Sequence, residues 1–419
     1  MHKPRLCKPL IRVAVFTTAG RPLLPKHCAQ VRSQHTHVTQ LYRDLDRIAP
    51  RFSIKPQDLT IFHSPSEFYD TLCKQILSAK RRIFFSTLYI GKTEHALIAT
   101  IAQALARNPT LQVTILCDAL RGTREHPNPC SASLLASLVR EYGSHRVDIR
   151  MYHTPNLRGW KKRVVPGRFN EGWGLQHMKL YGSDDTILLS GANLSNDYFT
   201  DRQDRYHVYR NKALVQWYEQ LFDLICGLSY RVVPTSTSFN LVWPESNIAV
   251  EPSKDVVAFK TKATEKLLAH FKPRDTSSNS LPVSPSTTIY PLAQLSQLLN
   301  TPSSTEYPAV CRVLSLLSQS SVTANWTFTA GYFNPAPEYT NLLLSSNTTN
   351  TGRVITASPY ANGFFGSKGI SSALPNAYLL LAAKFMRKVA EKRLDRVELE
   401  EWRRGTVGEP GGWTYHAKG

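Results

Sequence analysis

The most informative segment of the chain reads Gln176-His-Met-Lys-Leu-Tyr-Gly-Ser-Asp-Asp-Thr-Ile-Leu-Leu-Ser-Gly-Ala-Asn193. His177 and Lys179 are two residues apart in a strand-like segment, so their side chains leave the same face. Asp184 follows five residues after the lysine, and Asn193 ends a second apolar strand. The pattern is His-x-Lys-x4-Asp followed by Gly-x-Asn. It indicates either a catalytic site or, more simply, a strand with one polar face and a satisfied histidine.

A second copy of the His-x-Lys pair stands at the end of the sequence, in Gly412-Trp-Thr-Tyr-His-Ala-Lys-Gly419. The predicted strand that ends at Cys117 precedes His177 by 60 residues, and the one that ends at Thr356 precedes His416 by 60 residues. Two halves with matched order, each with a His-x-Lys pair, indicate an internal duplication. The duplication favours a catalytic site over a structural strand.

Helical and strand-like segments alternate in the first half of the chain. Apolar spacing predicts helices over residues 67–80 and 94–107. Compact apolar runs predict strands over residues 82–90 and 112–117. The alternation continues to about residue 230, which predicts an α/β fold with a mixed or parallel sheet.

The same order returns in the second half. Strands over residues 327–333 and 353–356 are followed by a segment, 376–404, that predicts one long helix. The charged end of this helix mixes both signs and favours a solvated face. A helix that lies on a membrane surface is the alternative.

Composition divides the chain into four parts. Residues 1–50 form a basic leader, and residues 51–230 form the first half. Residues 231–290 form a connection that includes the unpatterned Ser/Pro/Thr-rich run 271–288, where we expect a surface loop. Residues 291–419 form the second half.

The leader has the composition of a mitochondrial transit segment. Residues 1–43 contain no Asp or Glu, and Lys and Arg alternate there with hydroxyl and small apolar residues. The alternative is a basic arm that touches phosphates or lipid headgroups.

The overall composition is that of a globular protein with an anionic partner. Of the 419 residues, 42% are apolar and 20% are charged, which excludes a disordered or fibrous chain. The net charge of +20 points to nucleic acid, an acidic lipid surface or phosphorylated small molecules. No run of 18 apolar residues occurs, so we expect a soluble protein or one attached to a membrane face.

The paired His-x-Lys motifs resemble those of the phospholipase D superfamily. Within it, the chain is similar to the mitochondrial phosphatidylglycerophosphate synthases over nearly all of residues 51–419. The resemblance rests on Arg168-Phe-Asn-Glu-Gly-Trp-Gly-Leu-Gln-His-Met-Lys179, Ser190-Gly-Ala-Asn-Leu-Ser195, Asp201-Arg-Gln-Asp-Arg-Tyr206, Thr356-Ala-Ser-Pro359 and Asn362-Gly-Phe-Phe-Gly366.

The resemblance implies an α/β fold of two duplicated phospholipase D-like halves, each a mixed sheet flanked by helices. In that superfamily the second motif has an Asp five residues after its Lys, whereas the sequence given ends one residue after Lys418. We therefore expect the second half to be truncated and incomplete, and an inactive truncated form is one alternative.

The resemblance also implies an enzyme that transfers a phosphatidyl group from CDP-diacylglycerol to sn-glycerol 3-phosphate, releasing CMP, in cardiolipin biosynthesis. Such an enzyme needs no metal or other cofactor, and no nucleic-acid partner is expected. It would be attached peripherally to the anionic surface of the mitochondrial inner membrane, on the matrix face. The alternatives are a related enzyme that uses serine or water, and a basic phosphodiesterase that acts on nucleic acid.

Family analogy assigns roles to the paired motifs. His177 is the expected nucleophile, which would form a phosphohistidine, and His416 is the expected acid and base. Lys179 and Lys418 would hold the non-bridging phosphate oxygens, and Asn193 would add a hydrogen bond.

Asp184 belongs to the expected catalytic motif, in which it would organise its loop and the lysine. Other residues have expected supporting roles. Asp204 is a candidate partner for an imidazole N–H, with a surface ion pair to Arg205 as the alternative. Glu171 is a supporting candidate within its motif. The second phosphate, that of the acceptor, calls for a basic residue in a nearby turn, for which the candidates are Arg121, Arg124, Arg168 and Lys368.

Overall fold

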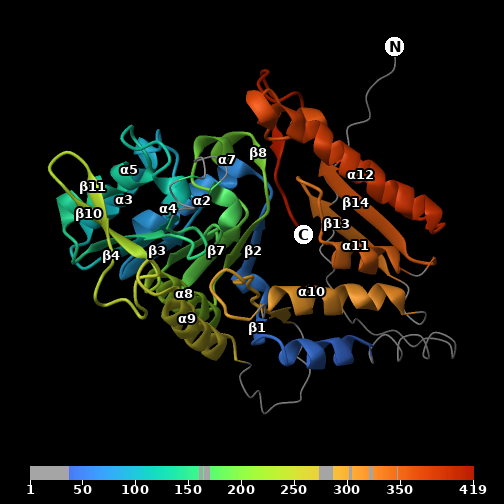
Figure 1. Ribbon diagram of the computed structural model, residues 1–419, viewed down its shortest axis with the longest axis horizontal. Coiled ribbons are helices and arrows are strands. Elements are labelled where there is room, and N and C mark those ends of the chain that lie inside the picture. Colours follow the sequence, from blue (N-terminus) through green and yellow to red (C-terminus); the bar gives the residue numbers. More distant parts are fainter. Residues whose placement is uncertain are drawn as a thin grey trace.

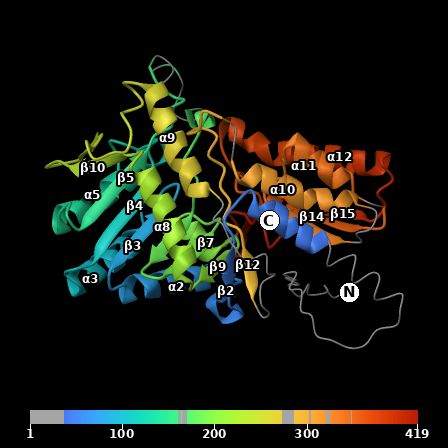
Figure 2. The ribbon, with the colours of Figure 1, turned by 90° about the horizontal axis from the view of Figure 1, so that it is seen from below.

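The computed structural model describes residues 37–159, 164, 170–272, 286–301, 304–319, 324–346 and 348–419. Most of the expected transit segment and most of the Ser/Pro/Thr-rich run lie outside these described residues. The described chain forms two halves side by side, the first mostly blue to yellow and the second in orange and red, although the blue helix at the start of the described chain lies against the second half (Figures 1 and 2).

The first half is built around one large mixed sheet. Its strands are β2 (Leu59–Phe62), β3 (Arg82–Ser86), β4 (Gln112–Asp118), β5 (Val147–Tyr152), β6 (Leu180–Ser183), β7 (Thr186–Ser190), β9 (Tyr206–Tyr209), β10 (Tyr230–Pro234) and β11 (Phe239–Val242). Within the described chain, these nine strands follow the order β11-β10-β5-β4-β3-β6-β7-β9-β2. β3, β4 and β5 are parallel to one another, and the other neighbours are antiparallel.

Helices cover both faces of this sheet (Figure 1). Ile83 and Phe85 of β3 face a core shared with α2 (Pro65–Ser78), α3 (His95–Arg107) and α5 (Ser131–Tyr142). Phe84, between them, faces a second core shared with α8 (Lys212–Cys226) and α9 (Val256–Phe271). Because successive side chains on a strand point to opposite faces, a strand buried on both sides is apolar throughout. Burial of β3 on both faces therefore explains the compact apolar run that begins at residue 82 of the sequence.

The first half extends beyond the boundary expected at residue 230. β10 pairs with β5 and β11 pairs with β10, so both strands belong to the large sheet. Phe259, Ala263 and Leu267 of α9 are buried in the second core. The expected connection 231–290 therefore contributes strands and a helix to the first half.

The second half contains a smaller parallel sheet. In its described part, three strands follow the order β13 (Asn325–Ala330), β14 (Thr351–Ala357) and β15 (Val397–Trp402). α10 (Glu306–Leu314), α11 (Pro337–Leu344) and α12 (Leu374–Glu391) accompany this sheet. The order β13-α11-β14-α12-β15 repeats β3-α3-β4-α5-β5, with parallel neighbours in both cases. The shared order agrees with the duplication predicted from the spacing of the motifs.

The prediction of one helix over residues 376–404 is wrong in its second part. α12 ends at Glu391, and Arg393 has a φ of 54°, which breaks the helical path. The chain then continues as β15. Val397 is buried and Leu399 packs against the same core, whereas Glu398 is exposed, so this segment follows a period of two. In β15, the alternation of apolar and charged residues therefore indicates a strand at the edge of the sheet.

The last residues of the sequence lie between the two halves. β16 (Thr414–Tyr415) pairs in parallel with β8 (Arg202–Gln203) of the first half. On the other side, Thr329 of β13 and Gly419 exchange backbone hydrogen bonds of 2.7 and 2.9 Å. A Cβ at Gly331 would lie 2.3 Å from the Tyr415 carbonyl oxygen, so this close approach requires glycine. The C-terminal segment therefore presents its His-x-Lys pair to the first half.

Candidate active site

The first His-x-Lys pair lies where β3, β4 and β6 meet. Asp118, at the end of β4, accepts a hydrogen bond of 2.9 Å from the Gln176 backbone N–H. The Gln176 side chain donates to the carbonyl oxygen of Thr87, just after β3, at 3.0 Å. These bonds fix the segment before β6 across the ends of two parallel strands. Burial of Asp118 raises its pKa to about 7.

Lys179 lies against its own motif. Its Nζ is 2.9 Å from His177 Nδ1 and 2.8 Å from the His177 carbonyl oxygen. Lys179 is buried, whereas the His177 side chain keeps one side open to solvent. Desolvation by the surrounding protein, followed by the charges of Lys179, Lys418 and His416, lowers the pKa of His177 to about 3. His177 is therefore a neutral, accessible imidazole.

His416 is buried and has a carboxylate partner. Its Nδ1 lies 2.7 Å from Asp204 Oδ2, and both residues are almost fully buried. The Tyr198 and Tyr332 rings approach the imidazole edge-on, with centroids at 5.3 and 5.8 Å. Burial lowers the pKa of His416 to about 4, and the Asp204 hydrogen bond opposes that change. Asp204 thus lies against an imidazole of the other half, and Arg205 contacts it only through a backbone N–H at 2.8 Å.

The two pairs share one electrostatic environment. Lys418 Nζ lies within 3.0 Å of both nitrogens of His416, a position over the ring. Burial lowers the pKa of Lys418 to about 8. Burial, followed by the charge of Lys418, lowers the pKa of Lys179 well below its usual range. The two buried amines and the two imidazoles lower one another's pKa. A bound anion would therefore stabilise this site.

Asn193 faces the same region with one polar atom to spare. It is 3% exposed, and its Nδ2 donates to Tyr198 Oη at 3.1 Å. Its Oδ1 has no hydrogen-bond partner among the described residues. Rotation of the amide by 180° would let Oδ1 accept from Tyr198 and would free the NH2 group for a ligand.

The structure does not bring Asp184 to the histidines. Asp184 lies in the turn between β6 and β7, at the opposite end of β6 from Lys179. Its carboxylate accepts backbone hydrogen bonds of 2.8, 2.9 and 3.1 Å from Lys80, Arg81 and Arg82. Asp184 therefore organises the backbone at the start of β3. Strand β6 separates Asp184 from the lysine of the motif. This corrects the expected catalytic placement.

Asp184→Asn should lower stability and leave the turnover number almost unchanged. Asparagine tolerates the φ of 48° at this position but loses the charge and one acceptor oxygen. We expect the free energy of unfolding to fall by about 1–2 kcal/mol. Asp184→Ala, which also strains the backbone, should cost about 1 kcal/mol more. Urea unfolding alongside turnover at saturating substrate checks this; a large loss of turnover at unchanged stability would restore a catalytic role.

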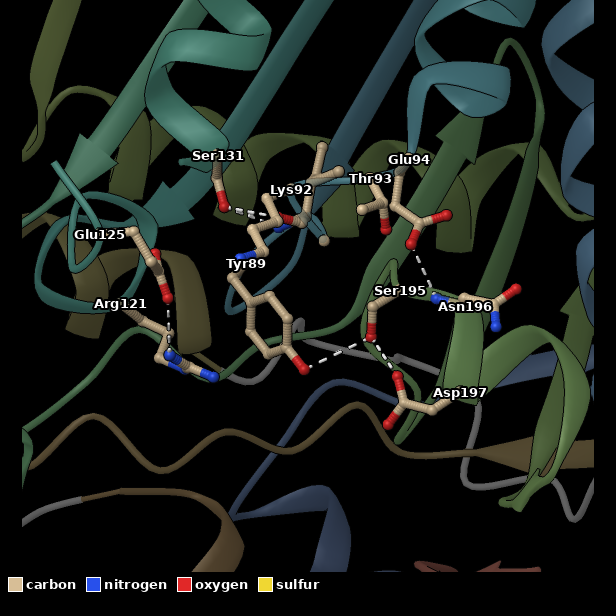
Figure 3. Close-up of a pocket in the computed structure, with 12 residues that line it drawn as sticks. Tyr89, Lys92, Thr93, Glu94, Arg121, Glu125, Ser131, Ser195, Asn196 and Asp197 are labelled. Carbon is tan, nitrogen blue, oxygen red and sulfur yellow. Dashed lines mark hydrogen bonds and ion pairs between the residues drawn. The ribbon is translucent and has the colours of Figure 1, made fainter. Parts of the chain in front are cut away.

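The candidate acceptor-binding residues fall in different places. Arg121 lines a pocket of about 290 Å³ with Tyr89, and its guanidinium lies 4.5 Å from the centre of the Tyr89 ring (Figure 3). Arg124 forms an ion pair with Glu171. Lys368 is exposed near the start of α12. Arg168 lies outside the described residues.

Sequence reasoning missed several residues beside the histidines. Arg202 donates to Tyr198 Oη at 3.0 Å and pairs with Asp197 at 3.0 Å. The motif around Arg202 was visible in the sequence, but its position was not. Tyr332 had no signal beyond its place after a strand. Among the described residues, no three His, Cys, Asp or Glu side chains converge to hold a metal ion.

The chain is similar to known proteins over most of its length. A family described as "Cardiolipin synthase, PLD-like domain" matches residues 72–226. A CDP-diacylglycerol–glycerol-3-phosphate 3-phosphatidyltransferase of Saccharomyces pastorianus is 49% identical over 377 residues, 88% of this chain and 71% of that protein. The mitochondrial human protein of the same name is 32% identical, over 95% of this chain and 74% of that protein.

A solved structure shares the fold. Phosphatidylserine synthase of Haemophilus influenzae superposes with a TM-score of 0.63 at 20% sequence identity, covering 91% of this chain and 79% of that one. At this identity the likeness concerns the fold, and it extends across both halves.

Proposed function

This chain belongs to the CDP-diacylglycerol–glycerol-3-phosphate 3-phosphatidyltransferase family, and we propose that it transfers a phosphatidyl group from CDP-diacylglycerol to glycerol 3-phosphate. One observation carries the mechanism. Two His-x-Lys pairs from different halves converge, and within the described part of the chain only the His416 imidazole has a carboxylate against it. Because of this difference, we assign the two histidines different roles in the reaction.

In the first step His177 attacks phosphorus. Attack by Nε2 requires the tautomer with hydrogen on Nδ1. Lys179, whose Nζ lies 2.9 Å from Nδ1, would then turn away from that nitrogen to the phosphate. A bond forms between Nε2 and the phosphorus next to diacylglycerol, and the bond from that phosphorus to the CMP oxygen breaks. His416 gives a proton to the departing CMP. Asp204 holds His416 Nδ1–H, which leaves Nε2 to carry the transferred proton.

In the second step the acceptor resolves the phosphohistidine. The glycerol 3-phosphate hydroxyl attacks phosphorus, its proton passes to His416 Nε2, and the N–P bond breaks to restore His177. Lys179, Lys418 and the Asn193 amide hold the non-bridging oxygens, where negative charge persists through both steps. The bound phosphate also raises the pKa of His416 and both lysines, so the site becomes protonated when it is filled.

The acceptor's own phosphate needs a separate cation. Arg124 is engaged by Glu171. Arg121, which lies 3.7 Å from Glu125 in a longer ion pair, borders an open pocket beside Tyr89 and Ser195 (Figure 3). We assign Arg121 to the acceptor phosphate for this reason, with Arg124 and Glu171 supporting the loop.

We also propose a location at the matrix face of the mitochondrial inner membrane, with peripheral attachment and no nucleic-acid partner. Mitochondrial relatives and the basic leader support the organelle. The charge of +20 supports attraction to an anionic surface. None of the described helices has the length and apolar character to span a bilayer. We also propose that the chain consists of two duplicated halves, which are divided near residue 290.

The test is acceptor dependence. CMP release from CDP-diacylglycerol is measured with EDTA present and with glycerol 3-phosphate, serine or water as acceptor, followed by identification of the lipid product. We expect release that requires glycerol 3-phosphate and yields phosphatidylglycerophosphate. Product made from serine or water would overturn the acceptor, and competition by DNA or RNA would support a phosphodiesterase instead.

A further inference from the structure

An apolar surface lies open near the start of α12. Ile370, Leu379 and Leu380 are 80%, 46% and 55% exposed. Ile370 belongs to the short helix that leads into α12, and the two leucines lie in the next turns. Large aliphatic side chains gathered at one helix end commonly mark an interaction site, because their exposure to water is unfavourable.

This surface adjoins the candidate active site. Tyr378, directly before Leu379, has its ring centre 5.3 Å from that of Tyr332. The Tyr332 ring is in turn 5.8 Å from the His416 imidazole. A Cβ at Gly363 would lie 2.5 Å from Tyr332 Oη, so the loop after β14 closes tightly on the same ring. The rings of Tyr378 and Tyr332 therefore form a chain of contacts from the first turns of α12 to His416.

Positive charge follows the apolar residues along the helix. Lys384, Arg387 and Lys388 are exposed in the next turns of α12, and Lys368 is exposed before it. No Asp or Glu occurs between Tyr339 and Ala390. The basic turns also border a groove of about 500 Å³, with Phe333, Leu381 and Phe385 among its apolar residues.

We propose that this α12 face, defined as Ile370, Leu379 and Leu380 with Lys368, Lys384, Arg387 and Lys388, docks on an anionic lipid bilayer. Apolar tips that enter the headgroup region, next to cations that meet lipid phosphates, are the chemistry of interfacial helices. The inference rests on the proposed function, because a lipid substrate then reaches His177 and His416 without leaving the membrane. A protein partner would call for a larger apolar patch, whereas this face is bordered mainly by cations, with Glu391 as the one carboxylate among the residues that line the groove.

The test compares the double variant Leu379→Glu/Leu380→Glu with Val257→Glu. Val257 is 70% exposed on α9 and provides a matched change from an aliphatic to an acidic residue elsewhere. Full-length proteins are sedimented with vesicles of phosphatidylcholine alone or with about one third phosphatidylglycerol. We expect the double variant to bind the anionic vesicles roughly 10- to 100-fold more weakly, and Val257→Glu to bind like the unchanged protein.

Turnover separates this inference from the proposed function. With long-chain CDP-diacylglycerol in vesicles, the double variant should lose activity in parallel with binding. With dispersed short-chain CDP-diacylglycerol, its activity should match that of the unchanged protein. Undiminished vesicle binding would overturn the docking face, and undiminished binding with altered oligomeric state would assign the face to a protein contact. Absence of short-chain turnover in the unchanged protein would overturn the function while leaving the binding result to stand.

Discussion

His177→Ala is expected to lower the rate of CMP release by at least about 10⁴-fold, because the variant has no nucleophile to form the covalent intermediate. The effect should fall on the turnover number, since in the proposed mechanism CDP-diacylglycerol is held by the lysines and by contacts away from the reacting nitrogen. Steady-state CMP release with saturating glycerol 3-phosphate measures it.

His145→Ala is the matched control. His145 is exposed and lies just before β5, at the end of the sheet opposite the candidate site. Its loss should leave turnover within about twofold, as for surface substitutions in general. Turnover within tenfold of normal in His177→Ala, with the control behaving as expected, would remove His177 from the chemistry.

Asp204→Asn is expected to reduce turnover by roughly 10²–10⁴-fold while the protein stays folded, because the amide no longer holds His416 in the required tautomer. The hydrogen bond from His416 to Asp204 raises the pKa of this buried imidazole, so its loss lowers that pKa further. In the proposed mechanism, His416 must be protonated to release CMP. The alkaline limb of kcat/KM against pH should therefore move to lower pH in the variant.

The pH profile distinguishes this role from a structural one. In the unchanged protein the alkaline limb of kcat should lie at higher pH than that of kcat/KM, because bound phosphate raises the pKa of His416. A uniform drop in turnover with both limbs in place would mean that Asp204 only supports the fold. Asp204→Glu, which can keep a carboxylate near Nδ1, should recover part of the activity and the position of the limb.

The sequence was most informative where periodicity and duplication reinforced each other. The run Arg82–Ser86 is apolar because it is buried on both faces, and strands of this kind are visible without a structure. The matched spacing of His177 and His416 from two strand ends reflects the shared order of β3 to β5 and β13 to β15. The repeat of the same order of elements in both halves indicated the fold more reliably than the pattern of either half alone.

The sequence was least informative where elements far apart in the chain meet. The sequence identified Asp204 as a candidate partner of an imidazole. Its pairing with His416, however, depends on the β8–β16 contact between the halves. Asp184 stood at the motif's expected position, yet four residues of strand carry it away from Lys179. The charges after Glu391 satisfied a helical pattern as well as a strand pattern, and only the pairing of β15 with β14 decides between them.

The position of α12 links the fold to the substrate. Its buried residues, Ala382, Phe385 and Val389, hold it on the small sheet, and Tyr378 holds its first turns against Tyr332. The packing of this helix therefore fixes the position of the exposed leucines next to Tyr378 in the sequence. Catalysis and membrane contact would then share one rigid element.

The covalent intermediate is the most direct test of the account. The protein is mixed with CDP-diacylglycerol labelled at the phosphorus bonded to diacylglycerol, without acceptor, and quenched in alkali within milliseconds, since phosphohistidine survives base. The account predicts a burst of CMP matched by label on the peptide that contains His177, released on addition of glycerol 3-phosphate and absent from His177→Ala. Label on His416 instead, or CMP release that begins only when acceptor is added, would contradict it.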